Sequence, residues 1–175
     1  GDFSKGSIAQ RINADLSNNF GNLVQRICSF INKNCNSTIS NSVNYNDEDN
    51  KLITFSINKF NKYSQYMKEQ NIDKSIKEVF ELLTETNIYV DKQAPWNLKK
   101  TNKERMKTVL SVSIEIIRRT TILLYPIMPK SCSNIFSLLN INSKDINISN
   151  YESISSKPLI INDPFPIFPR IELND

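Results

Sequence analysis

The sequence predicts an all-α protein, an antiparallel bundle of about five helices followed by an extended C-terminal tail. Apolar residues recur every three or four positions through most of the chain, which is the period of an amphipathic helix. No stretch alternates apolar and polar residues convincingly enough to predict a strand. Four of the seven prolines lie from Pro158 to Pro169, so the end of the chain is expected to be extended and to lie across another surface.

The first predicted helix runs from Ser4 to about Lys33 and is expected to bend near Gly21. Its apolar face consists of Ile8, Ile12, Leu16, Leu23, Ile27, Phe30 and Ile31. Polar residues repeat at the same helical spacing beside that face: Asn18, Asn22, Arg26, Ser29 and Lys33. The pattern predicts a continuous polar stripe along the helix, and such a stripe is usually just the solvated side.

The asparagine-rich residues 34–50 lack periodicity and are expected to form a loop. The acidic residues at the end of this loop, Asp47, Glu48 and Asp49, are interpreted as solvated rather than catalytic. A second helix is predicted from about Asn50 to Glu69.

A third helix is predicted from Asp73, as its N-cap, to Ala94. Pro95 lacks an N–H and disfavours helical geometry at Ala94. The helix should therefore end at Ala94, and Pro95 should take the first position of a new short turn.

A fourth helix from about Asn102 to Tyr125 is apolar over a wide arc and is expected to be the central helix. Its apolar residues are Met106, Val109, Leu110, Val112, Ile114, Ile116, Ile117, Leu123 and Leu124. Pro126 and Pro129 should end it, and a short fifth helix should follow from about Ser131 to Asn140. The tail begins near Ile141. We predict a helical domain over residues 1–145 and a tail over 146–175 that packs on the bundle or on a catalytic domain outside this chain.

The length and the net charge of the chain limit the classes of function that it can have. A chain of 175 residues with 39% hydrophobic composition can bury one sizeable core. The net charge of +4 excludes a bulk polyanion binder but leaves room for a modest basic face. Basic residues gather late in the chain: Lys92, Lys99, Lys100, Lys103, Arg105 and Lys107, followed by Arg118 and Arg119. The alternative is that they only solvate a helix end.

Several kinds of chemistry are excluded by what the chain lacks. It has no histidine, which removes His-based acid–base catalysis and most zinc sites, and its three glycines are too scattered for a phosphate-binding loop. Catalysis and metal binding are not expected in this segment. Three cysteines without a paired spacing indicate a reducing, cytoplasmic location. No apolar run is long enough to predict a membrane span. Because the chain lacks an initiator methionine, we treat it as a piece of a longer protein.

The stretch "KQAPWNLKK" holds the only tryptophan, Trp96, directly after Pro95 and among Lys92, Lys99 and Lys100. Such a residue could fill the core or could serve as a platform for a stacked base. The pattern alone favours the core.

Three stretches, in their order and separation, resemble one family: "NADLSNNFGNLVQR", "DKQAPW" and "PFPIFPRIE". They look like the anticodon-binding domain and C-terminal end of a bacterial or organellar methionyl-tRNA synthetase, a class I aminoacyl-tRNA synthetase. In that family a helical bundle follows a Rossmann-type catalytic domain and reads the CAU anticodon. The likeness covers nearly the whole chain. The long asparagine-rich loop departs from it, and so does the "IFPRIE" ending, where a leucine is expected.

The resemblance implies that Asn22, Arg26 and Trp96 contact the anticodon and that the partners are the tRNA(Met) anticodon stem-loop and an N-terminal catalytic domain. It also implies that ATP, Mg and, optionally, Zn belong to that catalytic part, because signatures of the "HIGH" and "KMSKS" type are absent here. Candidate contacts to the RNA backbone are Asn18, Lys33, Lys92, Lys99 and Lys100. The motif "PFPIFPRIE" is hypothesised to act as a strap between the bundle and the catalytic domain.

The chemistry of Asn22 and Arg26 suits cytosine. Four residues apart, the two side chains project from the same helix face. An asparagine oxygen can accept from the cytosine amino group while arginine donates to its ring acceptors, and uracil reverses part of that pattern. Two alternatives stay open. One is the helical domain of another class I synthetase; the other is a basic protein-interaction module, which would bury Trp96.

Overall fold

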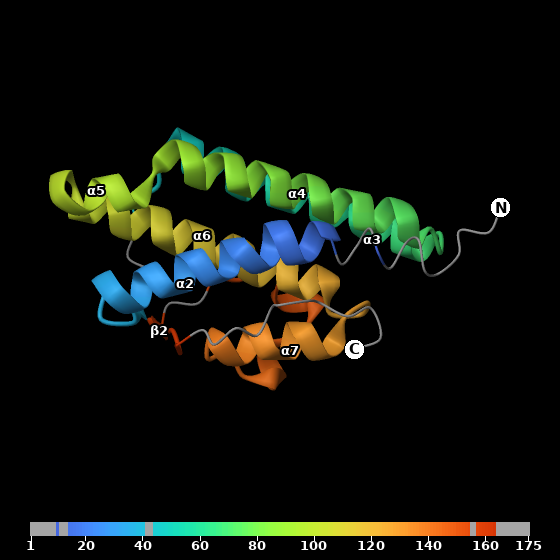
Figure 1. The fold of residues 1–175 in the computed structure, drawn as a ribbon. Helices are drawn as coiled ribbons and strands as arrows, with labels where there is room; N and C mark the ends of the chain where they lie inside the picture. Colours follow the sequence, from blue (N-terminus) through green and yellow to red (C-terminus); the bar gives the residue numbers. More distant parts are fainter. Residues whose placement is uncertain (1–9, 11–13, 41–43, 155–156, 164–175) are drawn as a thin grey trace.

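The computed structural model describes residues 10, 14–40, 44–154 and 157–163, and these form a helical bundle (Figure 1). Its longer helices are α2 (Asn22–Asn34), α3 (Asp47–Lys68), α4 (Ile72–Gln93), α6 (Lys103–Leu124) and α7 (Pro129–Leu138). The shorter elements are the π-helical turn η1 (Leu16–Gly21), α5 (Pro95–Thr101), the 3-10 turns η2 (Ser143–Asp145) and η3 (Ile148–Asn150), and the strands β1 (Thr38–Ile39) and β2 (Leu159–Ile160). The predicted all-α class with five packed helices is confirmed. The short antiparallel pair of β1 with β2 was not predicted.

Helix α6 is the centre of the bundle, as predicted. It contacts α2, α3, α4 and α7, and Figure 1 shows α4 and α7 on opposite sides of the molecule. All nine apolar residues assigned to its inward arc are buried. Buried hydroxyl groups on α6 donate to carbonyls four residues earlier, as Ser113 does to Val109 at 2.7 Å and Thr121 to Ile117 at 2.6 Å. These bonds satisfy the small polar side chains locally, so α6 can be enclosed by its neighbours.

Near Gly21, where a bend is expected, the structure has the π-helical turn η1, from which the chain continues directly into α2. Gly21 itself is buried. The Nδ2 group of Asn22 donates to the carbonyl of Asn18 at 2.6 Å, across the junction of the two elements. Except for Gln10, the part of the first predicted helix before Ala14 lies outside the described residues.

The prediction of a loop over residues 34–50 is wrong in two places. Strand β1 lies within it, and Ile39 is buried. Helix α3 begins at Asp47, because Asn46 and Asp49 form a capping box: the Asn46 side chain accepts from the Asp49 N–H at 3.0 Å, and the Asp49 side chain accepts from the Asn46 N–H at 3.0 Å. The acidic run is thus the first turn of a helix, where negative charge interacts favourably with the positive end of the helix dipole.

The expectation that Asp49 is solvated is also wrong, because its side chain is completely buried. Arg105 donates to it twice, from Nη1 to Oδ2 at 2.6 Å and from Nη2 to Oδ1 at 2.8 Å, and the Tyr89 hydroxyl donates to Oδ1 at 2.6 Å. Burial acts to raise the pKa of Asp49, but these hydrogen bonds and that from the Asn46 N–H outweigh it and hold the pKa below its usual range. Arg105 is therefore committed to an internal pair rather than to the basic face.

The ends of α4 agree only in part with the prediction. Its N-cap is Asn71, whose side chain accepts from the Lys74 N–H at 3.3 Å, and not Asp73. At the other end Ala94 has a left-handed backbone, with φ 45°, and is both the C-cap of α4 and the N-cap of α5. Pro95 takes the first position of α5, as predicted.

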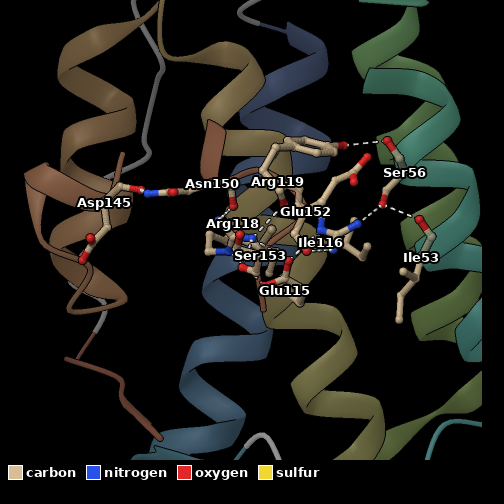
Figure 2. A network of polar contacts seen from close by, with 12 residues as sticks. Ile53, Ser56, Glu115, Ile116, Arg118, Arg119, Asp145, Asn150, Glu152 and Ser153 are labelled. Carbon is tan, nitrogen blue, oxygen red and sulfur yellow. Dashed lines mark hydrogen bonds and ion pairs between the residues drawn. The ribbon is translucent and has the colours of Figure 1, made fainter. Parts of the chain in front are cut away.

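The tail is not simply extended after Ile141, because its described part contains η2, η3 and β2. Arg118 on α6 donates to the carbonyls of Asn150, Tyr151 and Ser153 at 2.9, 2.8 and 3.0 Å, and Asn150 and Ser153 lie beside it in Figure 2. The Tyr151 hydroxyl is buried and donates to the Ser56 carbonyl at 2.7 Å. These bonds hold residues 150–153 against α6 and α3.

Arg119 is buried beside this segment. It donates to Glu115 Oε2 at 2.6 Å and to the Ser56 hydroxyl at 2.8 Å (Figure 2). Arg118 and Arg119 therefore anchor the fold and do not extend the basic cluster. The "PFPIFPRIE" motif, residues 164–172, lies outside the described residues.

Removing the Arg118 anchor should loosen the described tail without unfolding the bundle. In Arg118→Met the carbonyls of Asn150, Tyr151 and Ser153 lose a charged donor, so amide exchange in residues 150–153 should rise about tenfold or more. Hydrogen–deuterium exchange with mass spectrometry measures this directly. Lys130→Met, which removes an exposed charge on α7, is the control, and equal exchange in the two variants would contradict the anchor.

Asp49 should make the stability of the fold depend on acid pH. Its pKa is lower in the folded chain than the value of about 3.9 typical of unfolded chains. The ionised carboxylate therefore contributes its full share of folding stability above the unfolded pKa, and this share is lost as pH falls through the folded pKa. Asp49→Asn should cost about 3 kcal/mol near neutral pH because it breaks a buried pair. Urea unfolding at neutral and acid pH tests this: the difference between wild type and variant must shrink as pH falls.

Candidate RNA-binding surface

A groove of about 870 Å³ lies between the first helix and α4. One wall comes from η1 and α2 and includes Asn18, Asn19, Asn22, Gln25, Arg26 and Ser29. The other wall comes from α4 and includes Phe80, Thr84, Asn87, Ile88 and Asp91. Five of the fourteen lining residues carry side-chain amides. Because an amide both donates and accepts hydrogen bonds, the groove is suited to the polar edge of a nucleobase.

The polar stripe predicted on the first helix forms one wall of the groove. Asn18, Asn22, Arg26 and Ser29 all line it, because residues three or four apart share one helix face. Lys33, in the last turn of α2, belongs to the same stripe but does not line the groove.

The structure brings two of the predicted site residues, Arg26 and Trp96, into contact. The guanidinium carbon of Arg26 lies 5.2 Å from the centroid of the Trp96 ring. Arg26 Nη2 also lies 3.4 Å from Asp91 Oδ1, so the end of α4 and the start of α5 meet the same side chain. Asn22, one turn before Arg26, completes the group on α2.

Trp96 is not a core residue. The residue is 37% exposed, which contradicts the expectation of the protein-interaction alternative that it is buried. Exposed cation–π contacts contribute about 0.5–1 kcal/mol and exposed ion pairs about 0–1 kcal/mol. Stacking of a base on an aromatic ring contributes about 1–3 kcal/mol. A base can therefore compete with Arg26 for the ring.

The α4 wall of the groove was missed by sequence reasoning. Thr84, Asn87, Ile88 and Asp91 recur at helical spacing, which is the same signal that identified the stripe on the first helix. Ile88 is 53% exposed and adds an apolar surface beside the amides. That these residues face α2 depends on the packing of two distant helices.

None of the lysines proposed as backbone contacts lines the groove. Lys99 and Lys100 are exposed in the last turn of α5. Lys92 is also exposed, with its Nζ 3.7 Å from Glu48 Oε2. The groove lining carries one cationic residue, Arg26, and two acidic residues, Asp15 and Asp91. Electrostatic attraction for phosphate therefore has to come from basic residues outside the groove.

Among the residues that the structure describes, no group of three or more His, Cys, Asp and Glu side chains is placed to bind a metal ion. Within the same residues, none of the helices has both the length and the apolar character that a membrane span requires.

The sequence profile described as "Anticodon binding domain of methionyl tRNA ligase" matches residues 39–158. The chain is 34% identical over 174 residues to the methionine–tRNA ligase of Rhizobium meliloti and 33% identical over 180 residues to that of Rickettsia bellii. The alignments cover 97% and 98% of this chain, and 33% and 35% of these relatives. The chain thus spans about a third of the length of the curated relatives it matches.

Two solved structures of Mycobacterium tuberculosis methionyl-tRNA synthetase have a similar fold. The free-state structure matches with a TM-score of 0.86 and the structure bound by methionyl-adenylate with a TM-score of 0.85, both at 28% sequence identity. The matches cover 96% and 95% of this chain, and 35% and 34% of the two synthetase chains.

Removing Arg26 should uncover one face of the Trp96 ring. In Arg26→Ala the fluorescence of this single tryptophan should be quenched more strongly by acrylamide, while stability changes by less than about 0.5 kcal/mol because the contact is exposed. Lys33→Ala, two turns along the same helix, serves as the control. Identical quenching of Arg26→Ala and wild type would mean that Arg26 does not cover the ring in solution.

Proposed function

The chain belongs to the family of anticodon-binding domains of methionyl-tRNA ligases, and on this premise we propose that its groove binds the anticodon stem-loop of tRNA(Met) and reads the CAU anticodon. The observation that carries the proposal is the contact of Trp96 with Arg26, a residue that lines the groove beside several side-chain amides. It joins a hydrogen-bonding side chain and a stacking platform, which are the two parts that readers of unpaired bases use.

Asn22 and Arg26 are proposed to select cytosine at the first anticodon position. Both line the groove from α2, one helical turn apart. The Asn22 oxygen accepts from the cytosine amino group while Arg26 donates to the ring nitrogen and carbonyl oxygen. In the unbound chain the Nδ2 of Asn22 is already engaged by the Asn18 carbonyl, which supports this assignment because the Asn22 oxygen is then the atom available to the base. Uracil would present a carbonyl where that oxygen needs a donor, at a cost of about 1–3 kcal/mol.

Trp96 is proposed to stack on an anticodon base after Arg26 has moved toward the base edge. The weakness of the contacts that Arg26 makes with Trp96 and Asp91 supports this exchange. Asn18, Lys33, Lys92, Lys99 and Lys100 are proposed to contact phosphate or ribose around the loop. The exposure of the four lysines supports their part, since a phosphate contact requires an accessible ammonium group.

We also propose that this region acts within a longer methionine–tRNA ligase, in which a separate catalytic domain performs ATP-dependent aminoacylation. The relatives are methionine–tRNA ligases about three times as long as the matched region, which supports this arrangement. ATP, Mg and any Zn would belong to that other part. One Mycobacterium tuberculosis synthetase structure is described as bound by methionyl-adenylate.

The decisive experiment is a titration of a fluorescently labelled CAU anticodon stem-loop, compared with the UAU stem-loop at the same low salt concentration. Wild type should prefer CAU. Trp96→Ala should weaken CAU binding by about 1–3 kcal/mol, or about 5- to 150-fold, because stacking is lost. Trp96→Phe should retain most of the affinity, since it keeps an aromatic face.

The discrimination itself is tested with Asn22→Ala and Arg26→Ala. Each should reduce the preference for CAU over UAU more than it reduces binding of UAU, because it removes a group that reads the base. Lys99→Ala is the matched control and should weaken both RNAs alike. If wild type binds CAU and UAU equally and Trp96→Ala changes neither, the groove is not an anticodon reader.

A further inference from the structure

We propose that Gln93 and Arg105 are positioning residues that hold α5, and with it Trp96, in place for stacking. This inference rests on the proposed function, because it assigns them an effect on RNA binding through Trp96. Neither residue lines the groove. The side chain of Arg105 is only 17% exposed and is paired with Asp49, so it is not an accessible phosphate contact.

The two residues bracket α5 in the sequence and meet in space. Gln93 is the last residue of α4, and Arg105 lies in the first turn of α6. Arg105 Nη2 donates to Gln93 Oε1 at 2.8 Å. These two residues are 12 positions apart, and the segment that their hydrogen bond closes contains the whole of α5. A loop closed at its base has fewer accessible conformations than one tied only through the backbone. Trp96, the second residue of α5, is thereby restricted.

Arg105 can act as the fixed end of this tie because it is itself anchored. Asp49 accepts two hydrogen bonds from its guanidinium group, at 2.6 and 2.8 Å. Asp49 is in turn fixed by the capping box at the start of α3 and by the Tyr89 hydroxyl of α4. The hydrogen bond to Gln93 therefore connects the turn before Trp96 to three helices of the bundle.

The turn needs such a tie. Ala94 has φ 45°, a left-handed conformation that is unfavourable for a residue with a Cβ and that persists only when surrounding contacts enforce it. Pro95 removes a backbone donor directly after it. Without the bond at Gln93, the junction between α4 and α5 has fewer contacts to keep Trp96 over Arg26.

The test compares two variants of matched size. Gln93→Met removes the hydrogen-bond acceptor, whereas Gln93→Glu keeps it and can still accept from Arg105. We measure the fluorescence anisotropy decay of Trp96 without RNA and the affinity for the CAU stem-loop. In Gln93→Met the local motion of Trp96 should increase and CAU binding should weaken about tenfold, whereas Gln93→Glu should stay close to wild type in both.

A general loss of stability is separated from positioning by Asn71→Ala, which removes the N-cap at the opposite end of α4. That variant should unfold at a lower temperature but keep the wild-type motion of Trp96. The inference is overturned if Gln93→Met leaves the motion of Trp96 unchanged, whatever its affinity. It is also overturned if Asn71→Ala mobilises Trp96 to the same degree, or if Gln93→Glu behaves like Gln93→Met.

Failure of the proposed function gives a different result. If wild type binds CAU and UAU stem-loops equally, anticodon reading fails, and the anisotropy decay still decides whether Gln93 and Arg105 hold Trp96. If wild type prefers CAU while Gln93→Met keeps full affinity and full rigidity of Trp96, only the positioning role fails.

Discussion

The carboxylate of Asp49 is the constraint on which this end of the bundle depends. An unpaired buried carboxylate would be very unfavourable, and here Arg105, Tyr89 and the Asn46 N–H all donate to it. The start of α3, the end of α4 and the start of α6 must therefore meet at one point. Because α5 leaves α4 and joins α6 beside that point, the position of the short helix follows from the pairing of a single buried side chain.

A second network of hydrogen bonds, towards the other end of α6, fixes the position of the described part of the tail. Arg119 is buried against Glu115 and Ser56, and Arg118 donates to the carbonyls of Asn150, Tyr151 and Ser153. Helix α6 thus carries an arginine anchor near each end, and most of its apolar arc lies between them. Three of the arginines that composition alone assigns to a basic face are used to assemble the bundle instead, and exposed lysines are left to supply the positive surface.

The features that the sequence could predict are those with a local cause. The wide apolar arc of α6 predicts a central helix, and Pro95 predicts the break before α5. Asp49 could not be placed, because its partner Arg105 lies 56 residues away and a run of acidic residues resembles a loop. A local signal was nevertheless present, since Asn46 followed three residues later by Asp49 is the spacing of a capping box. The same reasoning applies to the groove: helical spacing groups Asn22 with Arg26, but only packing places Asp91 opposite them.

Two Asp–Arg pairs in this small region show how geometry separates structure from function. Arg105 and Asp49 are joined by two short hydrogen bonds and are largely removed from water, so exchange of partners would be costly. Arg26 and Asp91 have one contact at 3.4 Å, with side chains 45% and 65% exposed, so water or a ligand can replace either partner at little cost. A side chain that is to read a base must be oriented before binding and released during it. Under the proposed function the weak pair meets both requirements, and the strong pair nearby helps to hold the helices that carry Asp91 and Trp96.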